Sequence, residues 1–359
     1  MPRATEPRPV QRPEACTWLF LVTLWPLAVG LMACGSVGAT PTSYSWLGAG
    51  SAIPDRGEEG TGAMRVQWQV SLIDQSNSRY IPVELASPGF DPGRGRIYLG
   101  ASDGRFRAFD ANGRVLFRYN LGAPIESAPA VDLERDQVFV AGADGRVHAL
   151  RGADAEPIWR GRAPGIVRTQ PLLTRDAVYI VTEDDVVVAL SREDGESLWT
   201  YRREPAGEFH IAGHAGLTIV GRRLLAGFSD GTVAALDMTD GSVLWREPEQ
   251  LTITSMVASA GRLLVASADR GLELMEPDSR AVIWSRASER GAVTAPVLTP
   301  QGLVLVGDSQ GSFVALAMQS GQELGRLDGG NGFSAPAGVS HDLAVVLTNG
   351  GDALCLRLR

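Results

Sequence analysis

The stretch Ala235–Trp245, ALDMTDGSVLW, decides the fold. An apolar strand leads into it, an Asp-Gly pair in its middle indicates a turn, and the next strand opens on the tryptophan. Asp and Gly serve such turns because both tolerate backbone conformations that other residues avoid. Ala189–Trp199, ALSREDGESLW, has the same order of residues, and Ala149–Trp159, ALRGADAEPIW, has it more loosely. The stretch is therefore one copy of a repeated element.

The repeat has a period of about 40 residues and no sustained helical pattern. Four short strands in a unit of this length are typical of a β-propeller blade. An Asp-Gly type turn recurs, with its third residue at Gly104, Gly145, Asp185, Gly231, Gly271, Gly311 and Gly351. A second position of the repeat is aromatic in most units, and its residues are Trp68, Phe117, Trp159, Trp199, Trp245 and Trp284. In the penultimate unit Gly325 takes this position.

Seven turns predict seven blades. The last hairpin begins near Leu343, and the chain ends at Arg359 before a tryptophan strand can follow. One surplus strand, Val66–Val70, precedes the first hairpin. We therefore expect this N-terminal strand to complete the last blade and close the ring, which leaves no free edge at that blade. The predicted fold class is all-β, a single seven-bladed β-propeller of four-stranded blades over residues 65–359.

The N-terminus has the pattern of an export signal. The apolar stretch Trp18–Ala33 has the length of a signal-peptide core. Its last three residues and the cysteine that follows, LMAC at 31–34, resemble the bacterial lipobox. This resemblance implies a signal peptide over 1–33 and a lipid on Cys34. Gly35, which follows that cysteine, resembles the residue found at this position in outer-membrane lipoproteins. Residues 34–64 are rich in Gly, Ser, Thr and Pro, so they predict a flexible tether.

Composition excludes several classes of function. All 33 basic residues are Arg against 41 acidic residues, for a net charge of −8. The acidic balance argues against nucleic-acid binding, and the absence of Lys excludes Lys-based chemistry. After export only Cys355 remains besides the lipidated cysteine, so we expect no internal disulfide. Aligned on the repeat, Cys355 replaces Ala235, where a free cysteine behaves as a small buried hydrophobe.

The repeated stretch resembles the tryptophan-docking motif of the quinoprotein (PQQ-like) propellers, A-x-D-x-x-[TD]-G-x-x-x-W, over about residues 66–359. In that family the tryptophan packs between neighbouring blades. Lipobox, tether and single propeller together resemble the BamB type of lipoprotein, a scaffold of outer-membrane β-barrel assembly. This resemblance implies a protein partner in the barrel-assembly machinery and a place at the periplasmic face of the outer membrane, held through the lipid anchor only. BamB-type proteins have eight blades and seven are predicted here, so the wider group of lipoprotein propellers stays open.

The alternative function is a PQQ- or carbohydrate-binding enzyme or sensor of the quinoprotein type. Two G-x-S-x-G strings, at 227–231 and 307–311, resemble a hydrolase motif, but both lie at one repeat position between two strands. His210 and His214 lie in a long connector with no evident third metal ligand. The sequence therefore predicts no catalytic residue, no metal and no cofactor, and favours a non-enzymatic scaffold.

One feature points to a binding surface. Turns inside the blades and connectors between blades share one face of a propeller, so their charged residues are expected to form a rim for a basic or extended partner segment. Aspartates at turns also serve turn geometry alone, and this alternative stays open. The predicted rim comprises Asp103, Asp144, Asp184, Asp185, Asp230, Asp269, Arg202 and Arg203. A partner can also add a strand to an exposed sheet edge.

Overall fold

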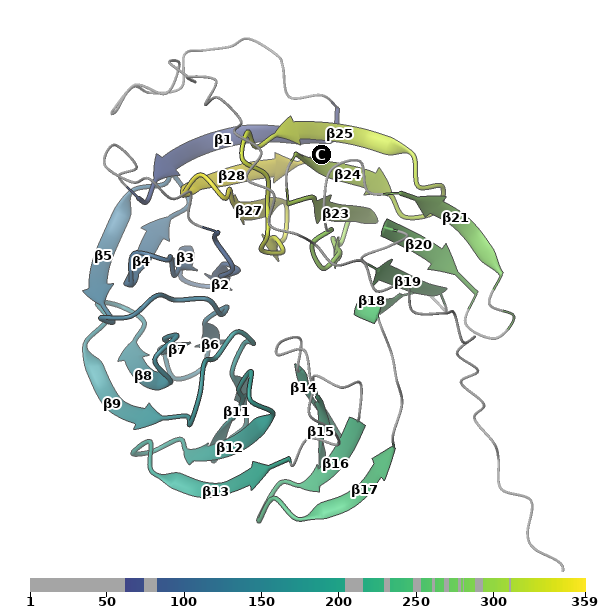
Figure 1. The fold of residues 1–359 in the computed structure, drawn as a ribbon. Helices are drawn as coiled ribbons and strands as arrows, with labels where there is room; N and C mark the ends of the chain where they lie inside the picture. The colour runs from purple at the N-terminus through teal and green to yellow at the C-terminus, as the bar shows by residue number, and fades with distance from the viewer. Residues whose placement is uncertain are drawn as a thin grey trace, which may run out of the picture. The chain divides into compact units, whose positions relative to one another are not determined.

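A computed structural model describes residues 62–73, 83–203, 216–228, 233–247 and, with gaps at 248–252, 260–261, 268–270, 277–278, 280, 288–292 and 310, the remainder to Arg359. The described residues form 28 strands in seven four-stranded antiparallel sheets, and no helix. Within the unit from Gly50 to Arg359 the sheets follow one another around a common centre (Figure 1). The prediction of an all-β fold with seven blades is confirmed.

The strands of each blade run from the centre outward in chain order. Blade 1 contains β2 (Gly89–Asp91), β3 (Arg96–Leu99), β4 (Arg105–Asp110) and β5 (Val115–Asn120). Blade 2 contains β6 (Ala130–Asp132), β7 (Gln137–Ala141), β8 (Arg146–Arg151) and β9 (Pro157–Arg162). Blade 3 contains β10 (Leu172–Leu173), β11 (Ala177–Val181), β12 (Val186–Ser191) and β13 (Ser197–Arg202). Blade 4 contains β14 (Gly216–Val220), β15 (Arg223–Gly227), β16 (Val233–Asp237) and β17 (Val243–Glu247).

The remaining three blades have the same order, except that the last takes its outer strand from the N-terminus. Blade 5 contains β18 (Ile253–Ser259), β19 (Arg262–Ser267), β20 (Gly271–Met275) and β21 (Val282–Arg286). Blade 6 contains β22 (Val297–Leu298), β23 (Leu303–Gly307), β24 (Ser312–Ala317) and β25 (Glu323–Asp328). Blade 7 contains β26 (Gly338–Ser340), β27 (Leu343–Leu347), β28 (Asp352–Leu358) and β1 (Met64–Ser71).

The N-terminal strand completes the last blade, as predicted. β1 pairs antiparallel with β28, and Trp68 lies opposite Cys355. In blades 2, 3 and 4 an alanine lies opposite the tryptophan in the same way: Ala149, Ala189 and Ala235. Cys355 is fully buried, and burial raises the pKa of its thiol to about 12, so the thiol stays protonated. It therefore fills the place of an alanine methyl group in the sheet.

Four tryptophans on outer strands make the same contact with the following blade, which we call the docking contact. In each, the indole N–H donates to a backbone carbonyl of the next blade's last turn. The four bonds are Trp68 to Ala111 at 3.0 Å, Trp159 to Arg192 at 2.8 Å, Trp199 to Met238 at 3.1 Å and Trp284 to Met318 at 3.0 Å. The indole thus fixes each blade to its neighbour by one directional bond and a large buried ring.

Each docking contact requires a glycine in the receiving turn, four residues before the next blade's own aromatic position. These receptor glycines all have positive φ, between 68° and 81°, and a Cβ on any of them would lie 2.4–2.8 Å from the tryptophan ring. A side chain there is excluded by both the backbone and the ring. The receptor glycines are Gly113, Gly195, Gly241 and Gly321.

The contact between blades 1 and 2 uses a smaller pair. Phe117 replaces the tryptophan, and Ala155, with φ of 61°, replaces the receptor glycine. Both residues belong to one hydrophobic cluster that spans the two blades. The smaller ring leaves room for the alanine methyl group, so the two replacements compensate each other.

Buried hydrophobic clusters lie between neighbouring blades. Among the described side chains, six clusters each join one pair of adjacent blades: 7 and 1, 1 and 2, 2 and 3, 3 and 4, 5 and 6, and 6 and 7. The outer-strand residue Trp245 differs from its counterparts. It is 36% exposed, against 7% for Trp68 and Trp159 and 9% for Trp199, so its ring is not buried as the motif led us to expect.

A double-mutant cycle at the first contact tests this account of the docking contact. We expect Phe117→Trp alone to destabilise the protein, because the larger ring meets the methyl group of Ala155. Combining it with Ala155→Gly restores the room, so the two substitutions should couple favourably by roughly 0.5–3 kcal/mol. Urea unfolding of the four proteins measures the coupling, and strictly additive effects would contradict the compensation.

Candidate interaction surface

The turn aspartates of blades 1 and 2 are held by their own turns. The Asp103 carboxylate accepts the backbone N–H of Arg105 at 3.0 Å and the Arg107 guanidinium at 3.1 Å. In the same way Asp144 accepts the backbone N–H of Arg146 at 3.1 Å and forms an ion pair with its guanidinium at 3.1 Å. Each carboxylate therefore shapes its turn and is neutralised by an arginine a few residues later.

Two residues of the predicted rim are buried in blade 3. Asp185 adopts a φ of 56° where most blades have a turn glycine, and its carboxylate lies 3.6 Å from the guanidinium of Arg203. Arg203 also stacks over the ring of Phe228, 5.5 Å from the ring centre. Both charged residues are buried. Their inclusion in an accessible rim was wrong, because both side chains are buried and form an ion pair inside the protein.

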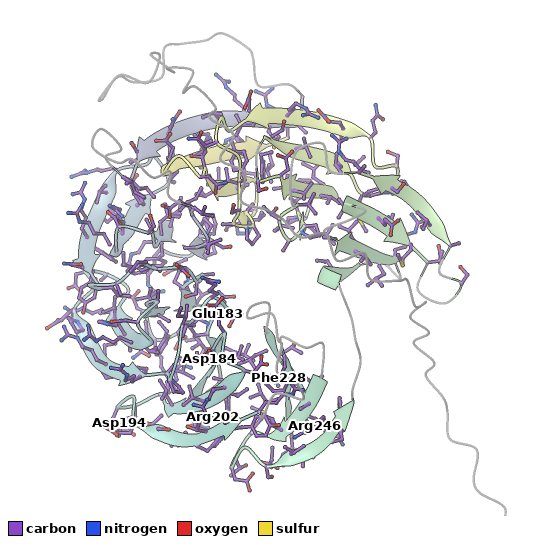
Figure 2. The ribbon with its side chains drawn as sticks, in the orientation of Figure 1. Glu183, Asp184, Asp194, Arg202, Phe228 and Arg246 are labelled. Atoms are coloured by element: carbon purple, nitrogen blue, oxygen red, sulfur yellow. The ribbon has the colours of Figure 1, made fainter. Side chains whose placement is uncertain are left out.

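Of the described rim residues, the two most exposed lie on blade 3. Asp184 and Arg202 are both exposed, and Figure 2 shows them on this blade, with Glu183 beside Asp184. Glu183 is bound by Arg168, whose Nε also donates to Glu126 at 2.7 Å. Asp230 and Asp269 lie outside the described residues.

The described turn carboxylates Asp103 and Asp144 are therefore each paired with an arginine, Arg107 and Arg146. Asp184 has no ion pair with another described residue. Exposed pairs of this kind contribute little to stability, and their neutralisation removes most of the attraction for a basic partner. The turn-geometry explanation accounts for Asp103 and Asp144, and Asp184 with Arg202 remains the candidate contact.

Blade 1 also buries a carboxylate that the sequence interpretation missed. Glu84 is fully buried and accepts the backbone N–H of Ser102 at 3.0 Å and its hydroxyl at 2.7 Å. Burial raises the pKa of Glu84. The corresponding connector positions in the next two blades are apolar, Ile125 and Val167, so a polar residue at a core position of the repeat was the available signal.

A buried histidine joins blades 1 and 2. The Nδ1 atom of His148 lies 3.0 Å from the hydroxyl of Tyr119, which also accepts from Arg160 at 3.2 Å. Burial lowers the pKa of His148 to about 4, with a further lowering by the charge of Arg160. Of the other nearby charged groups, Asp144 opposes this shift and Arg146 adds to it. His148 is therefore neutral at pH 7 and has a structural role.

The described residues bring together no catalytic constellation at the motifs noted above. Ser309 of the second G-x-S-x-G string lies between β23 and β24, and its carbonyl accepts from Asn349 of the next blade at 3.1 Å. The string is thus a hairpin turn, as the repeat predicted. The described residues contain no group of three or more potential metal ligands, and His210 and His214 lie outside them. They also include no helix with the length and apolar character needed to cross a membrane.

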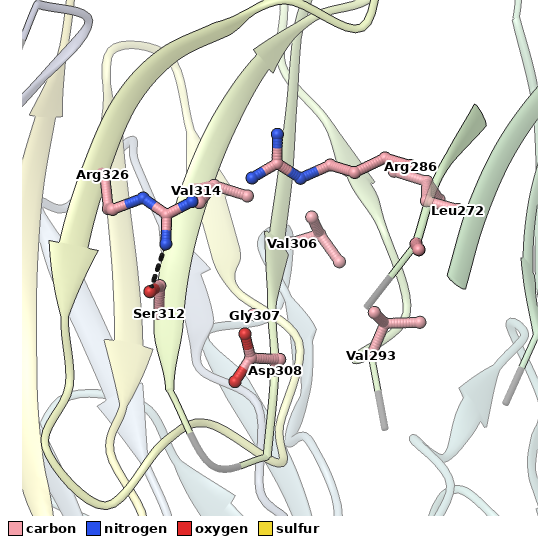
Figure 3. A pocket seen from close by; sticks show the side chains of 10 residues that line it. Leu272, Arg286, Val293, Val306, Gly307, Asp308, Ser312, Val314 and Arg326 are labelled. Atoms are coloured by element: carbon pink, nitrogen blue, oxygen red, sulfur yellow. Dashed lines mark hydrogen bonds between the residues drawn. The ribbon is translucent and has the colours of Figure 1, made fainter. Parts of the chain in front are cut away.

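A small cavity lies between blades 5 and 6. Figure 3 shows Arg286 and Arg326 above it and Asp308 below, with Arg326 donating to the Ser312 hydroxyl at 2.6 Å. Both arginines also bond to Glu323, at 2.6 and 2.7 Å. The cavity has a volume of about 30 Å³, room for about one water, whereas small-molecule sites span roughly 300–1,000 Å³. This cavity is too small for a quinone cofactor or a sugar.

Comparison with known proteins gives one consistent similarity. Residues 102–253 match the family model described as outer membrane protein assembly factor BamB. BamB of Legionella pneumophila (strain Paris) is 31% identical over 122 residues, 34% of this chain and 31% of that protein. BamB of Burkholderia pseudomallei (strain K96243) is 29% identical over 105 residues, 29% of this chain and 27% of that protein. The matches thus span about a third of the length of these relatives.

A solved structure shows the same fold. The crystal structure of BamB from Moraxella catarrhalis superposes with a TM-score of 0.65 at 16% identity, covering 82% of this chain and all of that one. At this identity the superposition supports the propeller fold alone.

The pH dependence of stability tests the role of His148. As the pH falls below 6.5, His148 becomes protonated in the unfolded chain, whereas in the folded chain it stays neutral down to about pH 4. The unfolding free energy of the wild-type protein therefore decreases as the pH falls from 6.5 to 4. His148→Val, which copies Val188 of the next blade, lacks this loss. We expect the variant's unfolding free energy to rise relative to wild type between pH 6.5 and 4 and to hold a constant difference above pH 7.5. Urea unfolding at a series of pH values measures it, and a difference independent of pH would contradict the buried neutral state.

Proposed function

We propose that this BamB-like PQQ-repeat protein is a non-enzymatic scaffold, lipid-anchored through Cys34 at the periplasmic face of the outer membrane, that holds a protein partner during outer-membrane β-barrel assembly. The observation that carries the proposal is the match of residues 102–253 to BamB. The seven-bladed fold and its likeness to a BamB structure support it. The export signal and lipobox of the sequence supply the anchor.

Blade 3 is the proposed place of partner contact. The blade lies inside the region that matches BamB, and it carries Asp184 and Arg202 as exposed charges of opposite sign. Its buried pair, Asp185 with Arg203, holds the turn and the end of β13 together. The buried pair gives Asp184 and Arg202 a rigid support. Two fixed, accessible charges suit the recognition of a folded partner, because complementary charges determine how and with which partner a protein docks.

Photo-crosslinking in envelope preparations tests the partner. A photoreactive amino acid at Asp184 or Arg202 is expected to capture a subunit of the barrel-assembly machinery. The control position is Glu134, which is exposed in the hairpin between β6 and β7, at the other end of its blade, and should capture none. If neither Asp184 nor Arg202 captures a subunit of the barrel-assembly machinery, the proposal is wrong. A clear thermal shift on adding PQQ with Ca²⁺ would favour the cofactor-binding alternative.

Membrane fractionation tests the anchor. Cys34→Ala removes the thiol that would carry the lipid, so the protein should move from the membrane to the soluble periplasmic fraction and lose incorporation of labelled fatty acid. Cys16→Ala is the matched control, because that cysteine lies within the predicted signal peptide and should change neither. Membrane association of Cys34→Ala equal to wild type would contradict lipid anchoring.

A further inference from the structure

The seam between blades 4 and 5 has a docking tryptophan without a receptor glycine. Trp245 of β17 stands where Trp159 and Trp199 stand in the two preceding blades. The receptor position, four residues before the next blade's Trp284, is Arg280. Arg280 itself lies outside the described residues, and its place is given by the repeat.

No side chain fits at a receptor position when a tryptophan is docked on it. A Cβ added to Gly195 would lie 2.4 Å from the Trp159 ring, and one added to Gly241 would lie 2.5 Å from the Trp199 ring. The contact that tolerates a Cβ, at Ala155, has the smaller ring of Phe117. An arginine opposite a full indole is therefore incompatible with the docking contact.

Two observations support the conclusion that Trp245 does not form the docking contact. Trp245 is 36% exposed, about four times the value for Trp199. Of the six hydrophobic clusters formed by described side chains, none contains residues of both blade 4 and blade 5. The tryptophan is thus present but left partly in solvent.

The result is an apolar strip on a sheet edge, which we call the β17 strip: Val243, Leu244, Trp245 and Arg246. Val243 and Leu244 are 41% and 47% exposed. β17 is the outer strand of its sheet, so its far side has no strand beside it. At the place of Val243 the two preceding blades have Pro157 and Ser197, so neither has three consecutive exposed apolar residues.

The end of the strip is positively charged. Arg246 is exposed and donates to the hydroxyl of Tyr201 at 3.0 Å, and no ion pair joins it to a carboxylate of the described residues. Among the described side chains, a neutral hydroxyl is thus the partner of this guanidinium, in a chain with a net charge of −8. A carboxylate on a partner would be complementary to it.

We infer that the β17 strip binds an extended segment of a partner protein in which apolar and acidic residues alternate. The segment adds a strand to the free edge of β17, so its backbone pairs with the strip. Its apolar side chains cover the indole of Trp245 on one face of the sheet, and its carboxylates lie beside Arg246 on the other face, because successive side chains of a strand point to opposite faces. A partly exposed tryptophan with aliphatic neighbours is the kind of group that anchors protein interfaces.

The inference goes beyond the proposed function and is independent of it. Binding at β17 can be measured with purified protein and a synthetic peptide, with no envelope component. A negative crosslinking result at Asp184 and Arg202 would not contradict binding at the β17 strip. A negative peptide-binding result would not contradict the proposed contact at blade 3.

Fluorescence anisotropy with a labelled peptide of about ten residues, the length of a long strand, tests it on the full chain purified in detergent. The peptide alternates Val and Glu, and a second peptide alternates Val and Lys. We expect the Val-Glu peptide to bind at least about fivefold more tightly, and Trp245→Ala to weaken its binding at least about tenfold. Equal affinity of the two peptides, or unchanged binding by Trp245→Ala, would overturn the inference.

Arg280→Gly supplies the missing receptor and is the sharpest test. With room restored, Trp245 should dock, so acrylamide should quench less of the tryptophan fluorescence and the Val-Glu peptide should bind at least about tenfold more weakly. Thermal unfolding should move upward, which shows that the loss of binding is not a loss of folding. Unchanged quenching would overturn the receptor argument.

The control for general damage to an outer strand is Leu198→Ala. Leu198 is as exposed as Leu244 but lies beside Trp199, which is docked, so its substitution should leave peptide binding unchanged. Light scattering completes the test. A dimer that disappears in Trp245→Ala would assign the strip to a second copy of the chain and overturn the partner segment.

Discussion

The contact of an indole with a glycine of the following blade is the interaction on which the rest of the structure depends. A four-stranded blade cannot bury both faces alone, so its stability comes from its neighbours. The indole supplies buried area, and its N–H selects one backbone carbonyl, which sets the spacing and rotation of the next blade. The same contact restricts the receiving turn to glycine at positive φ. A single local requirement thus accounts for the glycine that recurs four residues before the aromatic position at these four contacts.

The contact also explains what could be predicted from the sequence. Strands, blade number and the pairing of β1 with β28 follow from the repeat, and Cys355 could be placed opposite Trp68 by alignment alone. The candidate site could be predicted only in part. That Asp103 and Asp144 shape their turns follows from the Asp-Gly-Arg order around them. The burial of Asp185 with Arg203, and of His148 beside Tyr119, depends on which side chains neighbouring blades bring together. A repeat aligned on its backbone landmarks does not contain that information.

Neutralisation of the turn aspartates changes what the rim can do. A face with alternating paired charges attracts neither basic nor acidic partners at long range, but it can still discriminate between partners at contact. The proposed recognition would then depend on groups that, among the described residues, keep an unpaired charge or an exposed apolar surface. Asp184 and Arg202 on blade 3 and the β17 strip on blade 4 are such groups, and both blades lie in the region that matches BamB.

That region ends at residue 253, the first residue of β18 and of blade 5. Besides the Phe117 and Ala155 pair inside it, two departures from the docking contact lie beyond it: Arg280 at a receptor position in blade 5 and Gly325 at the aromatic position in blade 6. At the second departure the chain supplies another bond, because Ala63 ahead of β1 donates to the carbonyl of Leu324 at 2.9 Å, and a hydrophobic cluster joins blades 6 and 7. The first departure has no such cluster among the described residues. Elements with few buried contacts are the first to open and the readiest to accept new partners. As far as the structure describes it, the seam after Trp245 is therefore expected to open more readily than the seams that a hydrophobic cluster joins.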